Sequence, residues 1–152
     1  MKAHDADPTP ARRPPRYLAI SAPPPPIAGR RIATARDVYD LLPELRAEGR
    51  EHFVSFALNV RHHVIHKRIL AIGSLTGVEV HPREVFRQAI IDGAAALIFS
   101  HNHPSGDPTP SRPDVELTGR LREVGEVCGI AVLDHVIVAI DGFVSLAERG
   151  WK

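Results

Sequence analysis

The sequence contains a single cysteine, Cys128, so the chain can form neither an internal disulfide nor a cysteine-rich zinc module. Its formal net charge of +1 is nearly neutral, whereas a nucleic-acid-binding domain is usually strongly basic. No apolar run approaches the roughly 20 residues that a membrane helix needs. The apolar stretch from Tyr17 to Ile20 is also too short for the core of a signal peptide. We therefore expect a cytoplasmic protein that does not contact a membrane.

Proline, by contrast, is abundant and unevenly distributed. Residues 1 to about 30 hold most of the 14 prolines, including the run Pro23–Pro26, and have few side chains that could pack. This composition predicts a disordered, proline-rich leader over residues 1–30. The remaining residues, 31–152, are enough for one domain with a substantial core.

Helix and strand patterns alternate after the leader. Thr34 and Asp37 have the spacing of a helix cap, and Pro43 should divide the apolar pattern that follows into two short helices. A further helix should begin at His81-Pro82 and another should run from about Arg112 to Cys128. The predicted strands cover residues 53–60, 64–72, 78–80, 94–100, 130–140 and 143–146. This order predicts an α/β domain with three layers, in which helices flank a mixed central β-sheet.

The segment after the predicted strand 94–100 concentrates metal-binding side chains. His101 and His103 are two residues apart, so both rings point to one side of an extended backbone. Asp114 falls in the first turn of the next helix, where it could supply a third ligand. Two neutral imidazoles and a carboxylate form the ligand set of a catalytic zinc site with one open position. Non-haem iron sites use the same set, whereas a zinc deaminase is excluded because the P-C-x-x-C motif is absent.

Ser111 and Asp114 also have the spacing of a helix cap, which would explain both residues without a catalytic role. For Ser111 this structural interpretation is as strong as a functional one. For Asp114 the two neighbouring histidines favour a metal ligand. His135, which lies in a predicted strand, could support the site from outside the ligand set or serve the fold alone.

A hydrolytic metal site also needs a general base. The helical H-E-x-x-H motif, which carries its own glutamate, is absent, so the base must come from elsewhere in the chain. Glu51 stands immediately before the first central strand, where its side chain could reach the end of a neighbouring strand. The upstream candidates are Glu44, Glu48, Glu51, Glu79 and Glu84.

The pattern H-x-H-x7-S-x2-D at residues 101–114 resembles the metal-binding signature of the JAMM/MPN metalloprotease-like fold. The full segment, HNHPSGDPTPSRPD, is similar to the corresponding segment of the bacterial RadC family. The segments VEVHPREVFRQAI, LDHVIVA and FVSLAERGW extend the resemblance over roughly residues 35–152. The resemblance implies an MPN-type fold, Zn²⁺ ligands His101, His103 and Asp114, and an oxyanion-stabilising Ser111. The family's catalytic glutamate lies at the start of a central strand, which best matches Glu51.

The resemblance thus implies a zinc-dependent hydrolase that cleaves a peptide or isopeptide bond in a peptide or protein substrate. Zinc would polarise the carbonyl, Glu51 would transfer the proton and Ser111 would donate to the oxyanion. The alternative is a DNA-repair or mobile-element accessory protein that binds metal without hydrolysis. Longer family members carry an N-terminal helical domain that the proline-rich leader replaces here, so DNA contacts of that domain are not expected. The near-neutral charge also disfavours DNA as a partner.

Overall fold

The computed structural model of the chain describes residues 27–73 and 79–152. Five strands form one sheet in the order β2-β1-β3-β4-β5. β3 and β4 are parallel, and the other neighbouring strands are antiparallel. The sheet is therefore mixed, as predicted. Its strands are β1 (His52–Leu58), β2 (Val64–Ile72), β3 (Ala96–Asn102), β4 (Ala131–Ala139) and β5 (Gly142–Ser145).

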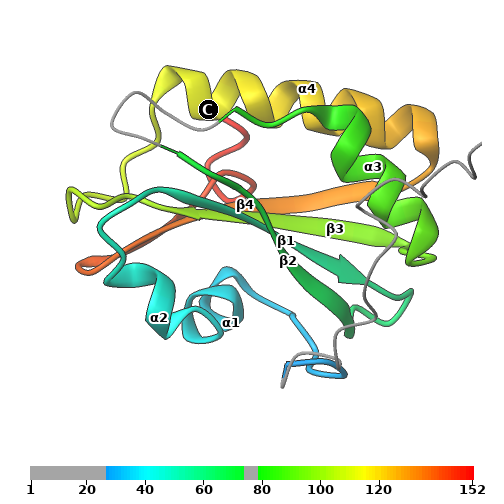
Figure 1. The fold of residues 1–152 in the computed structure, drawn as a ribbon, viewed down its shortest axis with the longest axis horizontal. Coiled ribbons are helices and arrows are strands. Elements are labelled where there is room, and N and C mark those ends of the chain that lie inside the picture. Colours follow the sequence, from blue (N-terminus) through cyan, green and yellow to red (C-terminus); the bar gives the residue numbers. More distant parts are fainter. Residues whose placement is uncertain (1–26, 74–78) are drawn as a thin grey trace, which may run out of the picture.

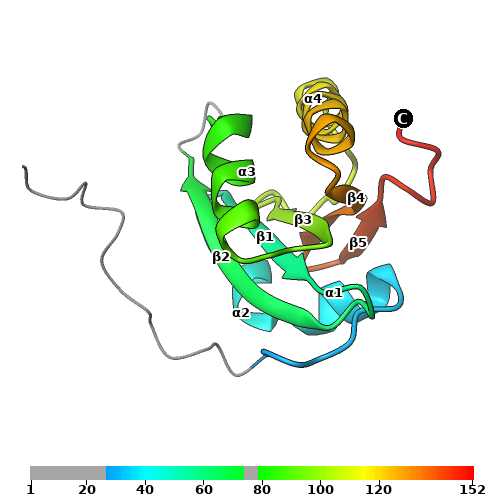
Figure 2. The ribbon, with the colours of Figure 1, turned by 90° about the vertical axis from the view of Figure 1, so that its right-hand side faces the viewer.

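Helices cover both faces of this sheet. The short helices α1 (Ala35–Asp40) and α2 (Pro43–Arg46) lie below it in Figure 1, and α3 (Pro82–Ile91) and α4 (Arg112–Cys128) lie above it. Figure 2, turned by 90°, shows the same three layers. This arrangement confirms the predicted three-layer α/β class. No helix in the described ranges is long and apolar enough to cross a membrane.

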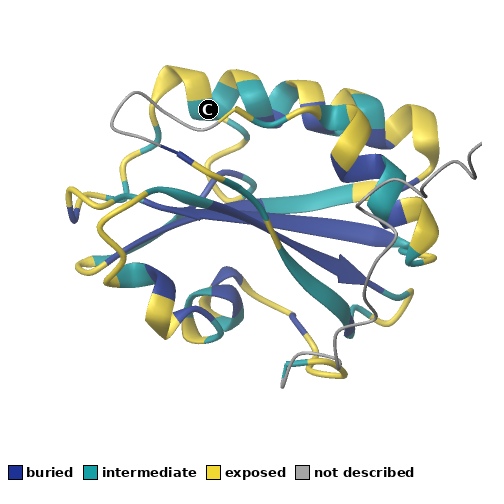
Figure 3. Ribbon diagram, in the orientation of Figure 1, coloured by how far each residue is buried: buried dark blue, intermediate teal, exposed yellow. Residues whose placement is uncertain are grey.

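Strand alternation supplies a separate apolar cluster to each face. Along β1, Phe56 packs with the α1 and α2 side, whereas Phe53 packs with the α3 and α4 side. Successive side chains of a strand point to opposite faces, so one buried strand contributes to both clusters. β1 and β3 are buried almost throughout (Figure 3). The candidate metal ligands at the end of β3 consequently start from a rigid, fully packed strand.

Most predicted bounds agree with the structure, and the differences have local causes. β1 ends at Leu58 instead of residue 60 because the Asn59 side chain accepts hydrogen bonds from the backbone N–H groups of Arg61 and His63 and makes a turn. β3 begins at Ala96 because the N–H of Ala94 still donates to the end of α3. β3 also continues two residues past the predicted end, so His101 is a strand residue.

The predicted strand 78–80 is wrong for the part that the structure describes. Val78 lies outside the described residues, and Glu79 and Val80 form no strand. Val80 packs against the apolar cluster below α3 and α4, so its partial burial does not require strand pairing. Pro82 then begins α3 directly.

Of the predicted leader, residues 1–26 lie outside the described residues, and residues 27–30 contact the domain. The N–H of Gly29 donates to the carbonyl of Val64 at 2.8 Å, and the N–H of Val64 donates to the carbonyl of Arg30 at 2.8 Å. Ile27 packs against the cluster below the sheet. These contacts attach the segment to the start of β2.

Glycine sets both the end of α4 and its distance from the sheet. Gly129, at a φ of +69°, ends the helix in the left-handed conformation that glycine adopts without strain. Gly125 allows close packing: a Cβ there would lie 2.6 Å from the carbonyl oxygen of Ile130. The helix can therefore lie close to β4 while its first turn reaches the end of β3.

Candidate metal centre

The end of β3, the residue after it and the first turn of α4 bring three predicted ligands together. His101 comes from β3, His103 follows the strand and Asp114 is the third residue of α4. One potential ligand atom from each residue lies within 4.8 Å of the others. The Nε2 atoms of the two histidines are 2.9 Å apart. Asp114 Oδ1 lies 3.2 Å from His101 Nε2, and Asp114 Oδ2 lies 3.3 Å from His103 Nε2.

The helix cap and the cluster use the same carboxylate. Ser111 is the N-cap residue: its Oγ accepts from the N–H of Asp114 at 3.3 Å. In return, Asp114 Oδ2 accepts from the N–H of Ser111 at 2.8 Å. The structural interpretation of Ser111 and Asp114 is therefore correct, and it does not compete with the contact to the histidines. The cap fixes the carboxylate where the two rings meet it.

The orientation of His103 is set by the loop backbone. Its Nδ1 lies 2.9 Å from the carbonyl oxygen of Asp107. A carbonyl only accepts, so Nδ1 carries the proton and the Nε2 of the neutral ring presents a lone pair to the cluster. The Asp107 carboxylate accepts from the N–H and hydroxyl of Thr109, which holds this turn. The N–H of His103 also donates to the carbonyl of Val138 at 2.9 Å.

This donor set fits a small divalent cation. Two neutral Nε2 atoms and a carboxylate would place three lone-pair-bearing atoms against one another, and a cation among them removes that repulsion. Ligand atoms about 2.0–2.1 Å from a tetrahedral zinc are themselves about 3.3 Å apart. The two separations between Asp114 and the histidines, 3.2 and 3.3 Å, agree with that value, whereas the two Nε2 atoms, at 2.9 Å, are closer together.

The electrostatics of the cluster keep Asp114 ionised. Burial acts to raise the pKa of Asp114, but hydrogen bonds from His101 and His103, made when these rings carry a proton on Nε2, hold that pKa well below the usual value. The hydrogen bond to Asp114 raises the pKa of His103 against the opposing effect of burial, and the charge of Glu51 adds a smaller increase. The cluster therefore holds a net negative charge ready for a cation when the rings are neutral.

His135 and Thr118 lie behind the cluster. Nε2 of His135, on β4, is 2.7 Å from Nδ1 of His101, so His135 supports the site directly. Burial holds the pKa of His135 well below its usual value, which keeps its ring neutral. Thr118 contacts the other side of His135, and sequence reasoning missed this residue. Its one signal was its position a helical turn after Asp114, on the same face of α4.

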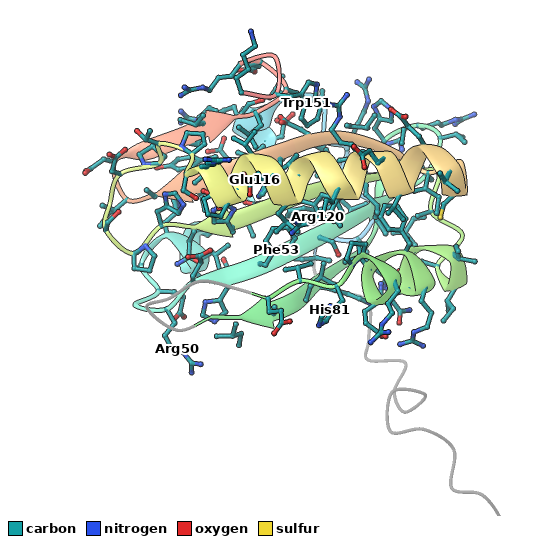
Figure 4. All side chains as sticks on the ribbon, turned by 90° about the horizontal axis from the view of Figure 1, so that it is seen from above. Arg50, Phe53, His81, Glu116, Arg120 and Trp151 are labelled. Carbon is teal, nitrogen blue, oxygen red and sulfur yellow. The ribbon has the colours of Figure 1, made fainter. Side chains whose placement is uncertain are left out.

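The cluster opens into a cleft of about 1240 Å³ between α4, the start of α3 and the start of β1. Its wall includes His103, Ser111 and Asp114, and Phe53 contributes an apolar surface. In Figure 4, seen from above, Phe53 and Arg120 lie beside α4 on the side that faces α3, and Arg50 points outwards at the lower left. The cleft gives an extended molecule access to two of the candidate metal ligands, His103 and Asp114.

Two of the five candidate bases line this cleft. Glu51 lies in its wall, and its charge acts on His103. Glu79 also lines the cleft, but its side chain is 84% exposed and lies 3.4 Å from His81. Glu44 contacts Lys67, and Glu84 pairs with arginines of α3. Glu48, like these two, does not line the cleft. The choice of base thus narrows to Glu51 and Glu79.

A family model for the RadC-like JAB domain matches residues 32–151. The chain is 52% identical to a UPF0758 protein of Bacillus licheniformis over 111 residues, and 52% identical to one of Halalkalibacterium halodurans over 120 residues. It is 46% identical to a UPF0758 protein of Methanococcoides burtonii over 123 residues. These alignments cover 73%, 78% and 80% of this chain but 50%, 52% and 54% of the relatives. The chain thus spans about half the length of the curated relatives it matches, whose names state no activity.

Proposed function

This chain belongs to the RadC family, and from its JAB-type domain we propose that it is a zinc-dependent hydrolase that cleaves a peptide or isopeptide bond. The observation that carries the proposal is the convergence of His101, His103 and Asp114 at one point, with His103 and Asp114 in the wall of an open cleft. Three protein ligands leave one position of a tetrahedral zinc free, which is the composition of catalytic rather than structural sites.

Each residue of the site has a distinct task in this proposal. His101, His103 and Asp114 hold the zinc, which when bound supplies a Lewis acid that polarises a carbonyl and lowers the pKa of water to about 7. Glu51 takes the proton from the attacking water and delivers it to the leaving amine. The cleft wall around Phe53 holds the chain on either side of the bond.

Ser111 stabilises the developing oxyanion. Its Oγ accepts the N–H of Asp114, and this cap contact does not use the hydroxyl proton. Because Ser111 is exposed and lines the cleft, that proton can be donated to an oxygen of the substrate. Preorganised donors of this kind contribute roughly 10²–10³-fold to acyl-transfer rates.

The test combines metal analysis with a peptide-cleavage screen of the zinc-loaded protein, with and without a chelator. Glu51→Gln should retain one zinc per chain and lose hydrolysis by about 10²-fold or more, because the amide cannot accept the proton. Glu79→Gln is the matched control and should keep both properties.

Loss of cleavage in Glu79→Gln alone would assign the base to Glu79. A zinc-loaded wild-type protein that cleaves no peptide would contradict the hydrolase proposal. That result would favour a metal-binding accessory protein in DNA repair or in mobile elements.

A further inference from the structure

A buried chain of side-chain contacts runs behind His101, on the side away from the cleft. Nδ1 of His101 lies 2.7 Å from Nε2 of His135, and Nδ1 of His135 lies 2.5 Å from Oγ1 of Thr118. The Thr118 hydroxyl in turn donates to the carbonyl of Asp114 at 2.6 Å. His101, His135 and Thr118 are at most 2% exposed, so water does not compete for these contacts.

We propose that Thr118 and His135 are positioning residues that hold the proton of His101 on Nδ1 and thereby keep its Nε2 lone pair available to the metal. This inference rests on the proposed function for the presence of zinc, but not for the proton positions. It gives the site two residues outside its ligands, one on α4 and one on β4.

The direction of each hydrogen bond follows from the single proton of the threonine hydroxyl. The Asp114 carbonyl can only accept a hydrogen bond, so the Thr118 hydroxyl donates its proton to this carbonyl. Thr118 can then only accept from His135, which places the His135 proton on Nδ1. A neutral ring protonated on Nδ1 has a lone pair on Nε2, and that lone pair must accept from His101 Nδ1–H. The remaining nitrogen of His101, Nε2, is left unprotonated and faces His103 and Asp114.

The surroundings hold the His135 ring in the required orientation. Phe53 meets it edge-on with ring centroids 5.2 Å apart, and Phe99 does so at 6.3 Å. In such an apolar environment a satisfied hydrogen-bond chain is strong, and an unpaired nitrogen would be costly. Reversal of the whole chain would turn the Thr118 hydroxyl towards His135 and leave two acceptors, Thr118 Oγ1 and the Asp114 carbonyl, facing each other. The contact with this carbonyl therefore favours the arrangement in which His101 is protonated on Nδ1.

This row of buried hydrogen bonds also connects two of the proposed metal ligands. Thr118 contacts the backbone of Asp114, which is itself a ligand, and reaches His101 through His135. His103, by contrast, has its Nδ1 against the carbonyl of Asp107 in its own loop. Outer partners of metal-bound histidines typically contribute about 10–100-fold to metal affinity. Most are carboxylates, carbonyls or water, and here a neutral histidine held by a threonine takes that place.

The first experiment measures zinc affinity by competition with a chromophoric chelator. Thr118→Val keeps the shape of the side chain and removes the hydroxyl, and it should weaken zinc binding about 10–100-fold. Thr118→Ser keeps the hydroxyl and should bind zinc within about threefold of wild type. Thermal unfolding of both metal-free variants separates this effect from a loss of stability. Equal zinc affinity of Thr118→Val and wild type would overturn the proposal.

The second experiment needs no variant and therefore does not depend on whether the substitutions fold. Nitrogen-15 NMR of the histidine rings in the wild-type protein should show His135 protonated on Nδ1 and unprotonated on Nε2. His135 protonated on Nε2 would overturn the proposal. Absence of zinc binding by the wild type would contradict the proposed function, whereas the His135 protonation state would still be read in the metal-free protein.

Discussion

Two helices of this protein begin with the same cap, and only one of the caps lies beside histidines. Thr34 and Asp37 form a capping box at α1, and Ser111 and Asp114 form one at α4. In both, the hydroxyl accepts from the N–H of the aspartate and the aspartate accepts from the N–H of the cap residue. The two patterns are equivalent in sequence and in local geometry.

The difference is what faces the carboxylate. Asp37 Oδ2 accepts from the N–H of Ala33, the N–H of Thr34 and the hydroxyl of Thr34, so its partners belong to its own helix start. Asp114 takes one backbone N–H, and its two oxygens face His101 and His103. A helix cap thus fixes the position of a carboxylate through local hydrogen bonds alone. The residues that lie opposite then decide whether the carboxylate can bind a metal.

The largest expected difference between the caps is in metal binding. Asp114→Asn replaces a charged ligand by a neutral amide and should weaken zinc binding by more than about 100-fold, beyond the usual effect of an outer partner. Asp37→Asn makes the same chemical change at α1 and should leave zinc binding unchanged. Metal content after gel filtration and chelator competition measure both. Stoichiometric zinc in Asp114→Asn would remove Asp114 from the ligand set.

Removal of the cap hydroxyls should separate stability from catalysis. Thr34→Ala and Ser111→Ala should each cost about 1 kcal/mol of unfolding free energy, or about 2–4 °C in Tm. Only Ser111→Ala should also slow hydrolysis, by about 10²-fold, because only that hydroxyl lines the cleft. Ser111→Thr keeps the hydroxyl and serves as the control. Equal rates of hydrolysis by Ser111→Ala and wild type at equal zinc content would show that Ser111 acts only as a helix cap.

The smallest expected effect is the pH dependence that the α1 cap contributes to stability. Hydrogen bonds from the N–H groups of Ala33 and Thr34 lower the pKa of Asp37 from its ordinary value of 3.8. The folded state therefore favours the ionised form. The resulting stabilisation is complete above the unfolded value and disappears as the pH falls through the folded value. The Tm difference between wild type and Asp37→Asn should accordingly shrink below about pH 3.8. A difference that stays constant down to pH 2.5 would contradict this assignment.

Local patterns in the sequence were sufficient where the physical cause is local. The caps, the break at Pro43, the bounds of β2 and the bounds of α4 follow from periodicity and turn chemistry, and the structure confirms them. The three candidate metal ligands were predictable because one histidine at the end of a strand and another just after it meet the first turn of the next helix. The strand predicted at 78–80 was wrong for Glu79 and Val80 because an apolar side chain can be buried without a strand partner.

The supporting residues of the site depend on contacts between distant parts of the chain. Thr118 meets His135 across 17 positions, and His135 meets His101 across 34. Apart from its position one helical turn after Asp114, nothing in the sequence around Thr118 distinguishes it from an ordinary helix residue. The sequence favoured Glu51 over Glu79 as the base, and both residues line the cleft in the structure. Only the fold identifies which distant elements meet.

Gly125 has a consequence for how the site tolerates change elsewhere in the molecule. From Gly125 back to Asp114 is eleven residues, or roughly 16 Å of helix. Any side chain at Gly125 would press on the backbone at Ile130 and lift that end of α4 from the sheet. A helix tilts as a rod more readily than it bends, so the displacement would reach the far end, where Asp114 faces histidines anchored on β3. The spacing of the candidate ligand atoms is therefore constrained by a residue that touches none of them, and we expect a substitution at this remote glycine to change that spacing.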